Sequence, residues 1–253
     1  MLDKNICDRT IWIYFYYYQK QNEKDYLEIK GGLKFMKRFK QSETNELAEI
    51  LKNDGVISVP TDTVYGVCAR IKSKNAYNNL VIVKNRPSTK PFPVMCANEE
   101  QIKSVAIVDE KAEKIIRNFM PGPITLVLKK KPEVPAYVNN GLETIAVRMA
   151  TSKALEDLIK KTESPIFMSS ANKSGEPTCT NLDEIEKSCP TIDGMMEGTV
   201  SFGEGSTIID CTQEEIKILR AGPITIQQIK EVIDNKSLRE IQWGYRDDST
   251  ICN

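Results

Sequence analysis

Apolar positions along the chain alternate between helical and strand periods from about residue 42 onward. Apolar residues that recur every three or four positions predict amphipathic helices, and short β-branched runs between turn signals predict strands. In SETNELAEILKND (42–54), Leu47, Ile50 and Leu51 share a helical face, Ser42 or Thr44 is expected to be the N-cap, and Asp54-Gly55 ends the helix. The same reasoning predicts helices over 75–83, 109–120, 152–161 and 225–234, and strands over 56–60, 92–96, 124–129, 144–149, 165–170, 206–211 and 215–220.

Helices and strands mix along this stretch without an internal repeat or a low-complexity linker. The 253 residues, 40% hydrophobic and 28% charged, have the composition of an ordinary globular protein. This order of elements predicts one α/β domain over residues 41–235. Residues 1–40 are expected to form a poorly ordered N-terminal extension, and residues 236–253 a polar C-terminal tail.

The N-terminal extension contains IWIYFYYY (11–18), a run of apolar and aromatic residues that is far too short to span a bilayer. Asp3 and Asp8 among the early cations, and the lack of a small-residue cleavage site, argue against a signal peptide. We expect an added strand or a tail, upstream of a domain for which Met36 could itself be a start. The predicted location is cytoplasmic, without membrane association.

Composition excludes several kinds of catalytic site. The chain has no histidine, which removes Ser-His and Cys-His nucleophile pairs, imidazole bases and His-containing metal sites. The seven cysteines include no Cys-x-x-Cys pair, which predicts scattered reduced thiols and no metal site. Lys plus Arg and Asp plus Glu both number 35, so the net charge is zero and any anion site must be local.

Cations and prolines gather in KNRPSTKPFP (84–93). Proline excludes helix, so the backbone is expected to be extended or turned, with Lys84 and Arg86 on one face. Two cations on one face of a stiff loop could clamp a polyphosphate, arginine as a planar fork and lysine as a point charge. The alternative is a solvated basic loop.

Two further segments place polar groups after predicted strands. PTDTVYG (60–66) packs two hydroxyls, a carboxylate and a phenol into a turn closed by glycine. Such groups line crevices in open α/β sheets, although they could also simply cap the next element. SSANKSGEPTCT (169–180) offers hydroxyls and backbone N–H groups that could hold an anion or a ribose, or serve only as caps.

Two arginines lie inside predicted strands. Arg148 in TIAVRM and Arg220 in KILRAG are either solvated or paired, because burying an unpaired arginine is very costly. The run GTVSFGEG (198–205) has the glycine spacing of a P-loop but lacks its Lys-Ser/Thr pair, which argues against a P-loop NTPase.

Taken together and in order, these segments resemble the YrdC-like family, whose members include the threonylcarbamoyl-AMP synthases of the TsaC type. The resemblance runs from about Ile50 to Ile229, with a KxR signature at Lys84-Asn85-Arg86 and an SxN signature at Ser170-Ala171-Asn172. The single-domain type is the better match, because only about thirty residues follow ILRAG (218–222). The segments that carry the resemblance are PTDTVYG, KNRPSTKPFPV, PGPITLVL, TIAVRM, SSANKSG, STIID and ILRAG.

The resemblance implies a single-domain α/β fold, a twisted mixed sheet with helices around a large concave basic cavity. It also implies a nucleotidyltransferase that forms L-threonylcarbamoyladenylate and pyrophosphate from L-threonine, bicarbonate or CO₂, and ATP, with Mg²⁺ bound to the ATP. The product feeds threonylcarbamoyladenosine (t6A) modification of tRNA by downstream threonylcarbamoyl-transfer proteins, and direct contact with tRNA or other RNA stays open. Neither chemical step demands an imidazole, in keeping with the missing histidine.

Expected site residues follow from the resemblance, position by position. Two residues of this chain stand where relatives contact threonine differently: Met95 replaces a histidine of some relatives, and at Met168 only backbone could serve, so amino-acid specificity stays open. The catalytic residues are expected to be Lys84 and Arg86; the ATP contacts Arg86, Lys90, Thr144, Ser170, Asn172, Thr178 and Arg220; and the threonine contacts Thr63, Arg148 and Ser206, with Arg148 on the carboxylate.

Two other functions remain open. A non-catalytic module of the same fold could bind double-stranded RNA; the zero net charge argues against it, although LKFMKRFK (33–40) could supply a basic patch. A relative that forms a carbamoyl adenylate from another donor is the third reading. Such relatives are modules of much larger chains with acylphosphatase and zinc-finger segments, which this sequence does not show.

Overall fold

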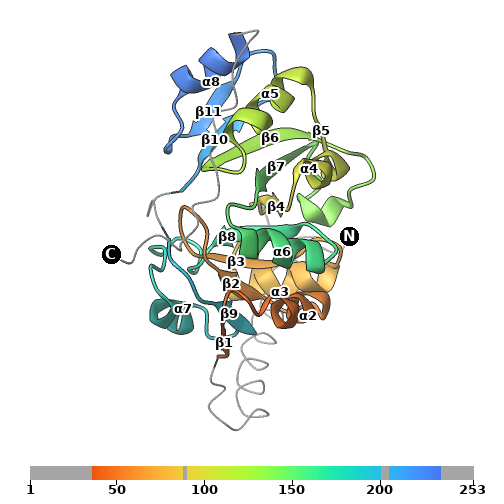
Figure 1. Cartoon of the computed structure of the whole chain (residues 1–253). Coiled ribbons are helices and arrows are strands. Elements are labelled where there is room, and N and C mark those ends of the chain that lie inside the picture. The colour runs from red at the N-terminus through yellow and green to blue at the C-terminus, as the bar shows by residue number, and fades with distance from the viewer. Residues whose placement is uncertain (1–35, 88–89, 201–204, 235–253) are drawn as a thin grey trace, which may run out of the picture. The chain divides into compact units, whose positions relative to one another are not determined.

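The chain folds around one mixed β-sheet, seen in the computed structural model of Figure 1. The structure describes residues 36–87, 90–200 and 205–234. Within these residues the sheet has eleven strands in the order β1-β9-β2-β3-β8-β4-β7-β6-β10-β11, with β5 on β6. Parallel pairs such as β4 with β7 stand beside antiparallel pairs such as β6 with β7, so the predicted mixed α/β sheet is confirmed.

Each element has the following bounds. The strands are β1 (Arg38–Phe39), β2 (Ile57–Val59), β3 (Gly66–Arg70), β4 (Val94–Cys96), β5 (Ala106–Ile107), β6 (Ile124–Lys130), β7 (Thr144–Met149), β8 (Ile166–Ser170), β9 (Gly194–Met196), β10 (Thr207–Asp210) and β11 (Lys217–Arg220). The helices are α2 (Thr44–Lys52), α3 (Lys74–Lys84), α4 (Glu99–Val105), α5 (Glu110–Phe119), η1 (Ala136–Val138), α6 (Lys153–Lys161), α7 (Leu182–Ser188) and α8 (Ile226–Asp234).

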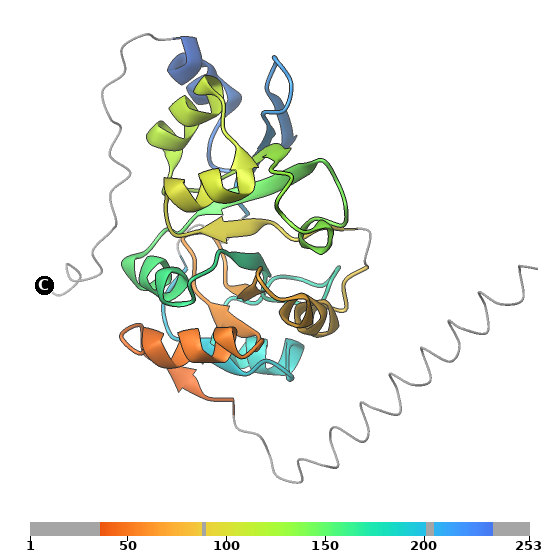
Figure 2. The ribbon, with the colours of Figure 1, turned by 90° about the vertical axis from the view of Figure 1, so that its right-hand side faces the viewer.

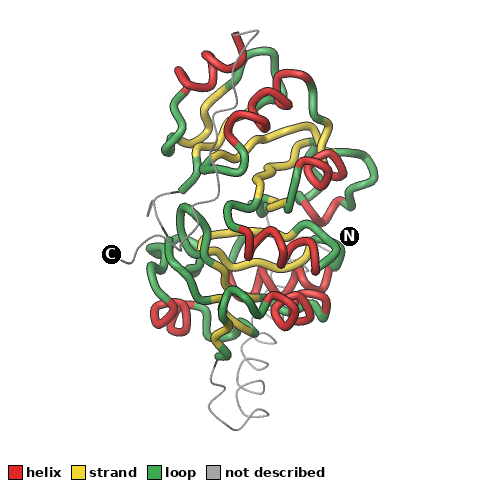
Figure 3. The backbone as a smooth tube through the Cα atoms, in the orientation of Figure 1, coloured by secondary structure: helices red, strands yellow, loops and turns green. Residues whose placement is uncertain are grey.

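Helices cover both faces of the sheet, as Figures 1 and 2 show for α2 and α6 on one face and α3 on the other. The side chains of α2 and α6 pack into the smaller of two hydrophobic clusters, with Leu47 and Leu155 fully buried. The larger cluster takes the apolar faces of α3, α5 and α7. Figure 3 shows how helices, strands and the loops between them follow one another along the backbone.

The long periodic segments fold as predicted. Helix α5 buries Ala112, Ile115, Ile116 and Phe119 on one face, and Asp109 caps it by accepting from the N–H of Ala112 at 2.8 Å. One cap prediction is wrong: neither Ser42 nor Thr44 is the N-cap of α2. The N-cap is Glu43, and the Thr44 hydroxyl accepts from Lys161 Nζ at 2.6 Å.

Several short elements have no counterpart among the predicted ones. Strand β3 begins at Gly66, immediately after the polar turn, and helices α4 and α7 are only seven residues long. Helix α7 buries a single residue, Ile185, so its sequence has no repeating apolar positions from which a helix could be predicted. Their local signals are the caps Asn98 and Asn181, with acidic residues in the first turn and a lysine in the last turn of each helix.

Part of the predicted organisation lies outside the described residues. The segment 11–18 and the tail over 236–253 belong to that part. Arg38 and Phe39, which the sequence assigned to the N-terminal extension, form β1 and pair with β9. In the part that is described, no helix has the length and apolarity needed to cross a bilayer. The five cysteines of this part are free and buried.

Candidate active site

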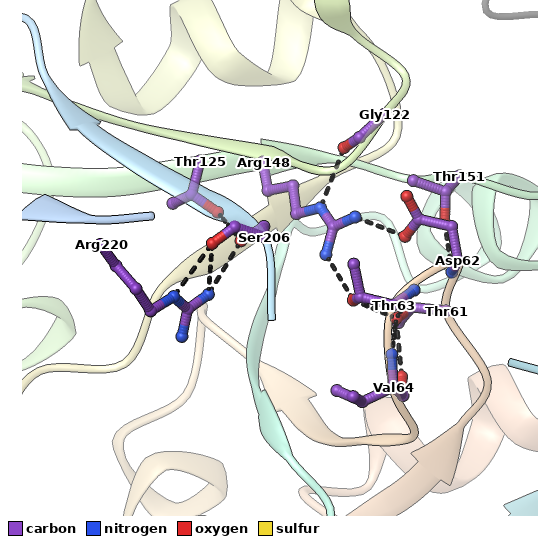
Figure 4. A network of polar contacts seen from close by, with 10 residues as sticks. All are labelled: Thr61, Asp62, Thr63, Val64, Gly122, Thr125, Arg148, Thr151, Ser206 and Arg220. Carbon is purple, nitrogen blue, oxygen red and sulfur yellow. Dashed lines mark hydrogen bonds and ion pairs between the residues drawn. The ribbon is translucent and has the colours of Figure 1, made fainter. Parts of the chain in front are cut away.

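Arg148 is the centre of a buried polar network at the carboxyl end of β7 (Figure 4). Its side chain is 8% exposed. Nε donates to the Gly122 carbonyl oxygen at 3.2 Å, Nη1 donates to Thr63 Oγ1 at 3.0 Å, and Nη2 forms an ion pair with Asp62 Oδ1. A guanidinium has five N–H groups, so two remain for a ligand. Burial lowers the pKa of Arg148 and the Asp62 carboxylate opposes this, so the side chain stays a cation.

The turn before β3 is ordered by the Thr61 hydroxyl. Its Oγ1 accepts from the backbone N–H groups of Thr63 and Val64, both at 3.2 Å, and donates to the Val64 carbonyl oxygen at 2.6 Å. The Thr63 hydroxyl lies 2.9 Å from Thr61 Oγ1 and accepts from Arg148 Nη1. The PTDT sequence therefore fixes Asp62 and Thr63 against the guanidinium.

Two glycines make room for this arrangement. A Cβ at Gly122 would lie 2.4 Å from the carbonyl oxygen of Phe119, so another residue would shift the loop whose carbonyl accepts from Arg148. A Cβ at Gly66 would lie 2.2 Å from the sulfur of Met168. The glycine that closes the polar turn thus lets the Met168 side chain cross β3.

Ser206 and Arg220 form the neighbouring part of the network in Figure 4. Ser206 Oγ lies 2.8 Å from Thr125 Oγ1, and Arg220 donates to the Ser206 carbonyl oxygen from Nε at 2.9 Å and from Nη2 at 2.7 Å. Burial lowers the pKa of Arg220. A Cβ at Gly205 would lie 2.7 Å from the guanidinium, so glycine is needed for this close approach.

Lys84 is at the centre of a second cluster and is only 1% exposed. Its ammonium donates to the carbonyl oxygens of Ser170 and Asn172 and to Asn172 Oδ1, the first at 2.6 Å and the last at 2.8 Å. Ser170 Oγ donates to the same Asn172 Oδ1 at 2.6 Å. The structure thus joins the KxR and SxN signatures through Lys84, which braces the loop that follows β8.

The prediction of an extended segment that starts at Lys84 is wrong. Helix α3 runs through Lys84 and ends at Asn85, which has the left-handed conformation (φ 45°). Proline restricts the residue before it, so Pro87 constrains Arg86 but leaves Lys84 free to stay helical. Lys84 and Arg86 are therefore not two cations on one face of a strand, and the Lys84 ammonium is already enclosed by oxygen acceptors.

The buried Lys84 ammonium is expected to titrate far below an ordinary lysine. Burial lowers its pKa from 10.5 to about 8, so it keeps its proton at neutral pH and can donate to all three oxygens. In nuclear magnetic resonance of ¹³C,¹⁵N-labelled protein, the Lys84 Nζ resonance should move with a midpoint near 8. A midpoint above about 10, the ordinary range, would contradict a pKa lowered by burial.

The lowered pKa of Lys84 also determines the direction in which the free energy of unfolding changes with pH. Between pH of about 8 and 10.5 the unfolded chain holds a proton on Lys84 that the folded chain has released. From this group alone, the free energy of unfolding therefore rises with pH across that window and is lowest below pH 8, where both states are protonated.

Arg86 is held by its own loop. Nε donates to the Lys90 carbonyl oxygen at 2.9 Å, Nη2 donates to the Pro91 carbonyl oxygen at 3.0 Å, and the guanidinium lies 4.8 Å from the centre of the Phe92 ring. Burial lowers the pKa of Arg86. Two of its five N–H groups are used, so three remain for an anion.

The remaining expected contacts are not joined to these clusters. The Lys90 side chain is exposed, and Thr178 is half-buried. Across the described ranges, no hydrogen bond links the side chain of Thr144 or Thr178 to the other candidates. Thr144 instead lines a cavity of about 480 Å³ with Lys129 and Leu142. That Lys90, Thr144 and Thr178 line one basic cavity with the other candidate residues stays a prediction.

Methionines form the apolar side of the Arg148 region. Met95 is opposite Arg148 in the register of β4 and β7, which places both side chains on the same face of the sheet. Met95 and Met168 both belong to the smaller hydrophobic cluster. Neither can donate a hydrogen bond from its side chain, so the polar contacts here come from the PTDT turn, Arg148 and Ser206.

Two polar residues of the network were not predicted from the sequence. Asp62 pairs with Arg148, and Thr125 contacts Ser206. The carboxylate between two threonines in PTDTVYG was a visible signal for Asp62, whereas nothing in the apolar run ITLVL marks Thr125. For the residues that the structure describes, no group of three or more carboxylates or cysteines could hold a metal ion.

Comparisons with known proteins give a consistent set of relatives. The family model Sua5/YciO/YrdC, described as telomere recombination, matches residues 49–222. The threonylcarbamoyl-AMP synthase of Pyrococcus abyssi is 34% identical over 200 residues, 78% of this chain and 59% of that protein. That of Bacillus subtilis is 34% identical over 195 residues, 74% of this chain and 56% of that protein.

The solved structures agree with the sequence matches. The crystal structure of P. abyssi Sua5 complexed with L-threonine has a TM-score of 0.74 to this chain at 32% identity, covering 79% of this chain and 61% of that one. The chain thus spans less than two thirds of the length of these relatives. The single-domain type expected from the sequence stays a prediction.

Proposed function

Because the chain belongs to the Sua5/YciO/YrdC family, we propose that it is an L-threonylcarbamoyladenylate synthase, which makes threonylcarbamoyl-AMP and pyrophosphate from L-threonine, bicarbonate or CO₂, and ATP. Two relatives carry the name threonylcarbamoyl-AMP synthase, and P. abyssi Sua5 has been crystallised with L-threonine. The observation that carries the proposal is Arg148, buried, cationic and with two N–H groups left for a carboxylate.

The reaction depends more on the positioning of its substrates than on acid–base catalysis. The threonine amine attacks carbon of CO₂ to give a carbamate and loses a proton; a carbamate oxygen then attacks the α-phosphorus of ATP, and pyrophosphate leaves. Arg148 would hold the amino-acid carboxylate, with the hydroxyls of Thr63 and Ser206 beside it. Arg86, Arg220 and Lys90 are proposed to neutralise charge on the phosphates, and rate would come from orientation and charge stabilisation.

Lys84 fits a positioning role better than a direct one. Its three acceptors belong to Ser170 and Asn172, both proposed as ATP contacts. The ammonium would therefore fix the loop after β8 in the shape that receives the nucleotide. Thr144 and Thr178 remain proposed ATP contacts by family resemblance.

Mg²⁺ would arrive as part of the ATP substrate, held mainly by phosphates and water. The product is proposed to pass to proteins that transfer the threonylcarbamoyl group to tRNA. A cytoplasmic location is likewise proposed from the sequence. The names of the relatives do not favour the non-catalytic RNA-binding alternative. Mass spectrometry of a reaction with ATP, L-threonine and bicarbonate should detect the adenylate, and omission of any one should abolish it.

An Arg86→Ala variant is expected to reduce kcat/KM for ATP at least about 100-fold, because a charge-assisted fork on the phosphates is lost. The KM for L-threonine should change much less. Arg117→Ala is the matched control, since the Arg117 side chain is 64% exposed and pairs with Glu113 on α5. Unchanged steady-state rates and an unchanged KM for ATP in Arg86→Ala would remove this residue from the phosphate site.

A further inference from the structure

The ion pair between Arg148 and Asp62 has an unused carboxylate oxygen. Asp62 accepts from Arg148 through Oδ1, and its backbone N–H donates to Thr151 Oγ1 at 3.3 Å. Among the residues described, the contact from Arg148 goes to Asp62 Oδ1, and no group donates to Asp62 Oδ2. The Asp62 side chain is 18% exposed against 8% for Arg148, so a small ligand could reach it.

The charge balance of this pair limits what can bind beside it. The positive charge of Arg148 is already matched by Asp62, and the other two partners of the guanidinium, Gly122 and Thr63, are neutral. A simple carboxylate that bound to Arg148 would add a second negative charge beside Asp62, which desolvation penalises and which the charge of Arg220 offsets only in part. A ligand that brings a carboxylate and an ammonium together adds no net charge.

We propose that Asp62 is a specificity-determining residue that binds the α-ammonium of the amino-acid substrate through Oδ2 while Arg148 binds its carboxylate. The pair is then a receptor for a zwitterion. The two charges of an α-amino acid are joined through a single carbon, and the two charges of the receptor are held in direct contact, so the separations match. The inference rests on the proposed function for the identity of the substrate and adds the selection of an α-amine.

A purely structural role for Asp62 makes a different prediction. If Asp62 only oriented Arg148, its loss would weaken the binding of every carboxylate ligand equally, whether or not the ligand carries an amine. If Asp62 binds the ammonium, its loss should weaken the binding of the amino acid alone. The deaminated counterpart of threonine, 2,3-dihydroxybutanoate of the same configuration, keeps the carboxylate and the β-hydroxyl and replaces the amine by a hydroxyl. The pair of ligands therefore separates the two roles.

The test is calorimetric titration of the full chain with both ligands. The unaltered protein should bind L-threonine at least about tenfold more tightly than the hydroxy acid, since sites built around a substrate polar group reject analogues that lack it. Asp62→Asn keeps an acceptor for Arg148 but removes the charge. It should weaken the binding of L-threonine at least about tenfold without weakening that of the hydroxy acid, because the competing negative charge beside Arg148 is removed, and so erase the preference.

Asp54→Asn is the matched control. Asp54 pairs with Arg70 at 3.0 Å, its side chain is 25% exposed, and its φ of 65° suits asparagine. This variant should leave both affinities unchanged. Equal weakening of the two ligands by Asp62→Asn, or no effect on either, would overturn the proposal. If Asp62→Asn does not fold, equal binding of the two ligands to the unaltered protein overturns it instead.

The outcomes also separate this inference from the proposed function. A protein that prefers L-threonine over the hydroxy acid, and loses the preference in Asp62→Asn, supports the inference even if no pyrophosphate is released. A protein that releases pyrophosphate with threonine, yet keeps its preference in Asp62→Asn, supports the function and contradicts the inference.

Discussion

An Arg148→Ala variant is expected to lose at least about 100-fold in kcat/KM for L-threonine, with the KM for ATP within about threefold of the unaltered protein. Truncating one partner of a buried, hydrogen-bonded charge pair between protein and ligand costs about 2–5 kcal/mol of binding free energy, and about 1.4 kcal/mol corresponds to a factor of ten. The Arg148 guanidinium contacts Gly122, Thr63 and Asp62 at once, and no other cation among the described residues does so. Steady-state pyrophosphate release at varied threonine measures the loss.

Two further variants keep this result interpretable. Arg148→Lys retains the charge but not the fork, and should recover only part of the loss. Arg70→Ala removes an arginine whose side chain is 27% exposed and paired with Asp54, and should leave the threonine kinetics unchanged. Thermal unfolding of each variant shows whether the fold is retained. An Arg148→Ala protein that is folded and has an unchanged KM for threonine would contradict the carboxylate role.

The second large effect is expected on stability. A Lys84→Met variant fills a similar volume but removes the Lys84 donor from the Asn172 carbonyl oxygen, whereas the Ser170 carbonyl oxygen still accepts from the Asn172 N–H at 3.0 Å. Each buried polar group left without a partner costs about 1–3 kcal/mol, so the free energy of unfolding should fall by about 1–3 kcal/mol. Urea unfolding monitored by circular dichroism measures the change.

Lys74→Met on the same helix is the control for that change. Lys74 is exposed at the first turn of α3, and its substitution should alter the free energy of unfolding by less than about 0.5 kcal/mol. Equal stability of the Lys84→Met and Lys74→Met proteins would show that the enclosed ammonium contributes nothing to the fold. Lowered stability with retained turnover would make Lys84 a purely structural residue.

Sequence reasoning succeeded where the local pattern decides the structure. Strand β7 has the bounds 144–149 that its β-branched alternation predicts, and α5 buries the four residues that its period places inward. It failed at Lys84, because proximity to proline was given more weight than the helix that precedes it. It also missed β9 and β1, which are short and depend on partners distant in the chain.

The site shows the same division. Thr63, Arg148, Ser206 and Arg220 were expected and lie in one region of Figure 4, but the partners that hold them could not be read from the chain. Asp62 and Arg148 are 86 residues apart, as are Lys84 and Ser170. Such contacts are set by the order of strands in the sheet, which local periodicity does not encode.

Pyrophosphate release by the purified full chain, measured across single amino acids with bicarbonate present and absent, tests the proposed activity most directly. Release is expected to require ATP, bicarbonate and an amino acid together, and it should be markedly faster with L-threonine than with the other amino acids because the site around Arg148 must also accept the β-hydroxyl. Pyrophosphate formed at the same rate without threonine, or without bicarbonate, would contradict the proposed synthase.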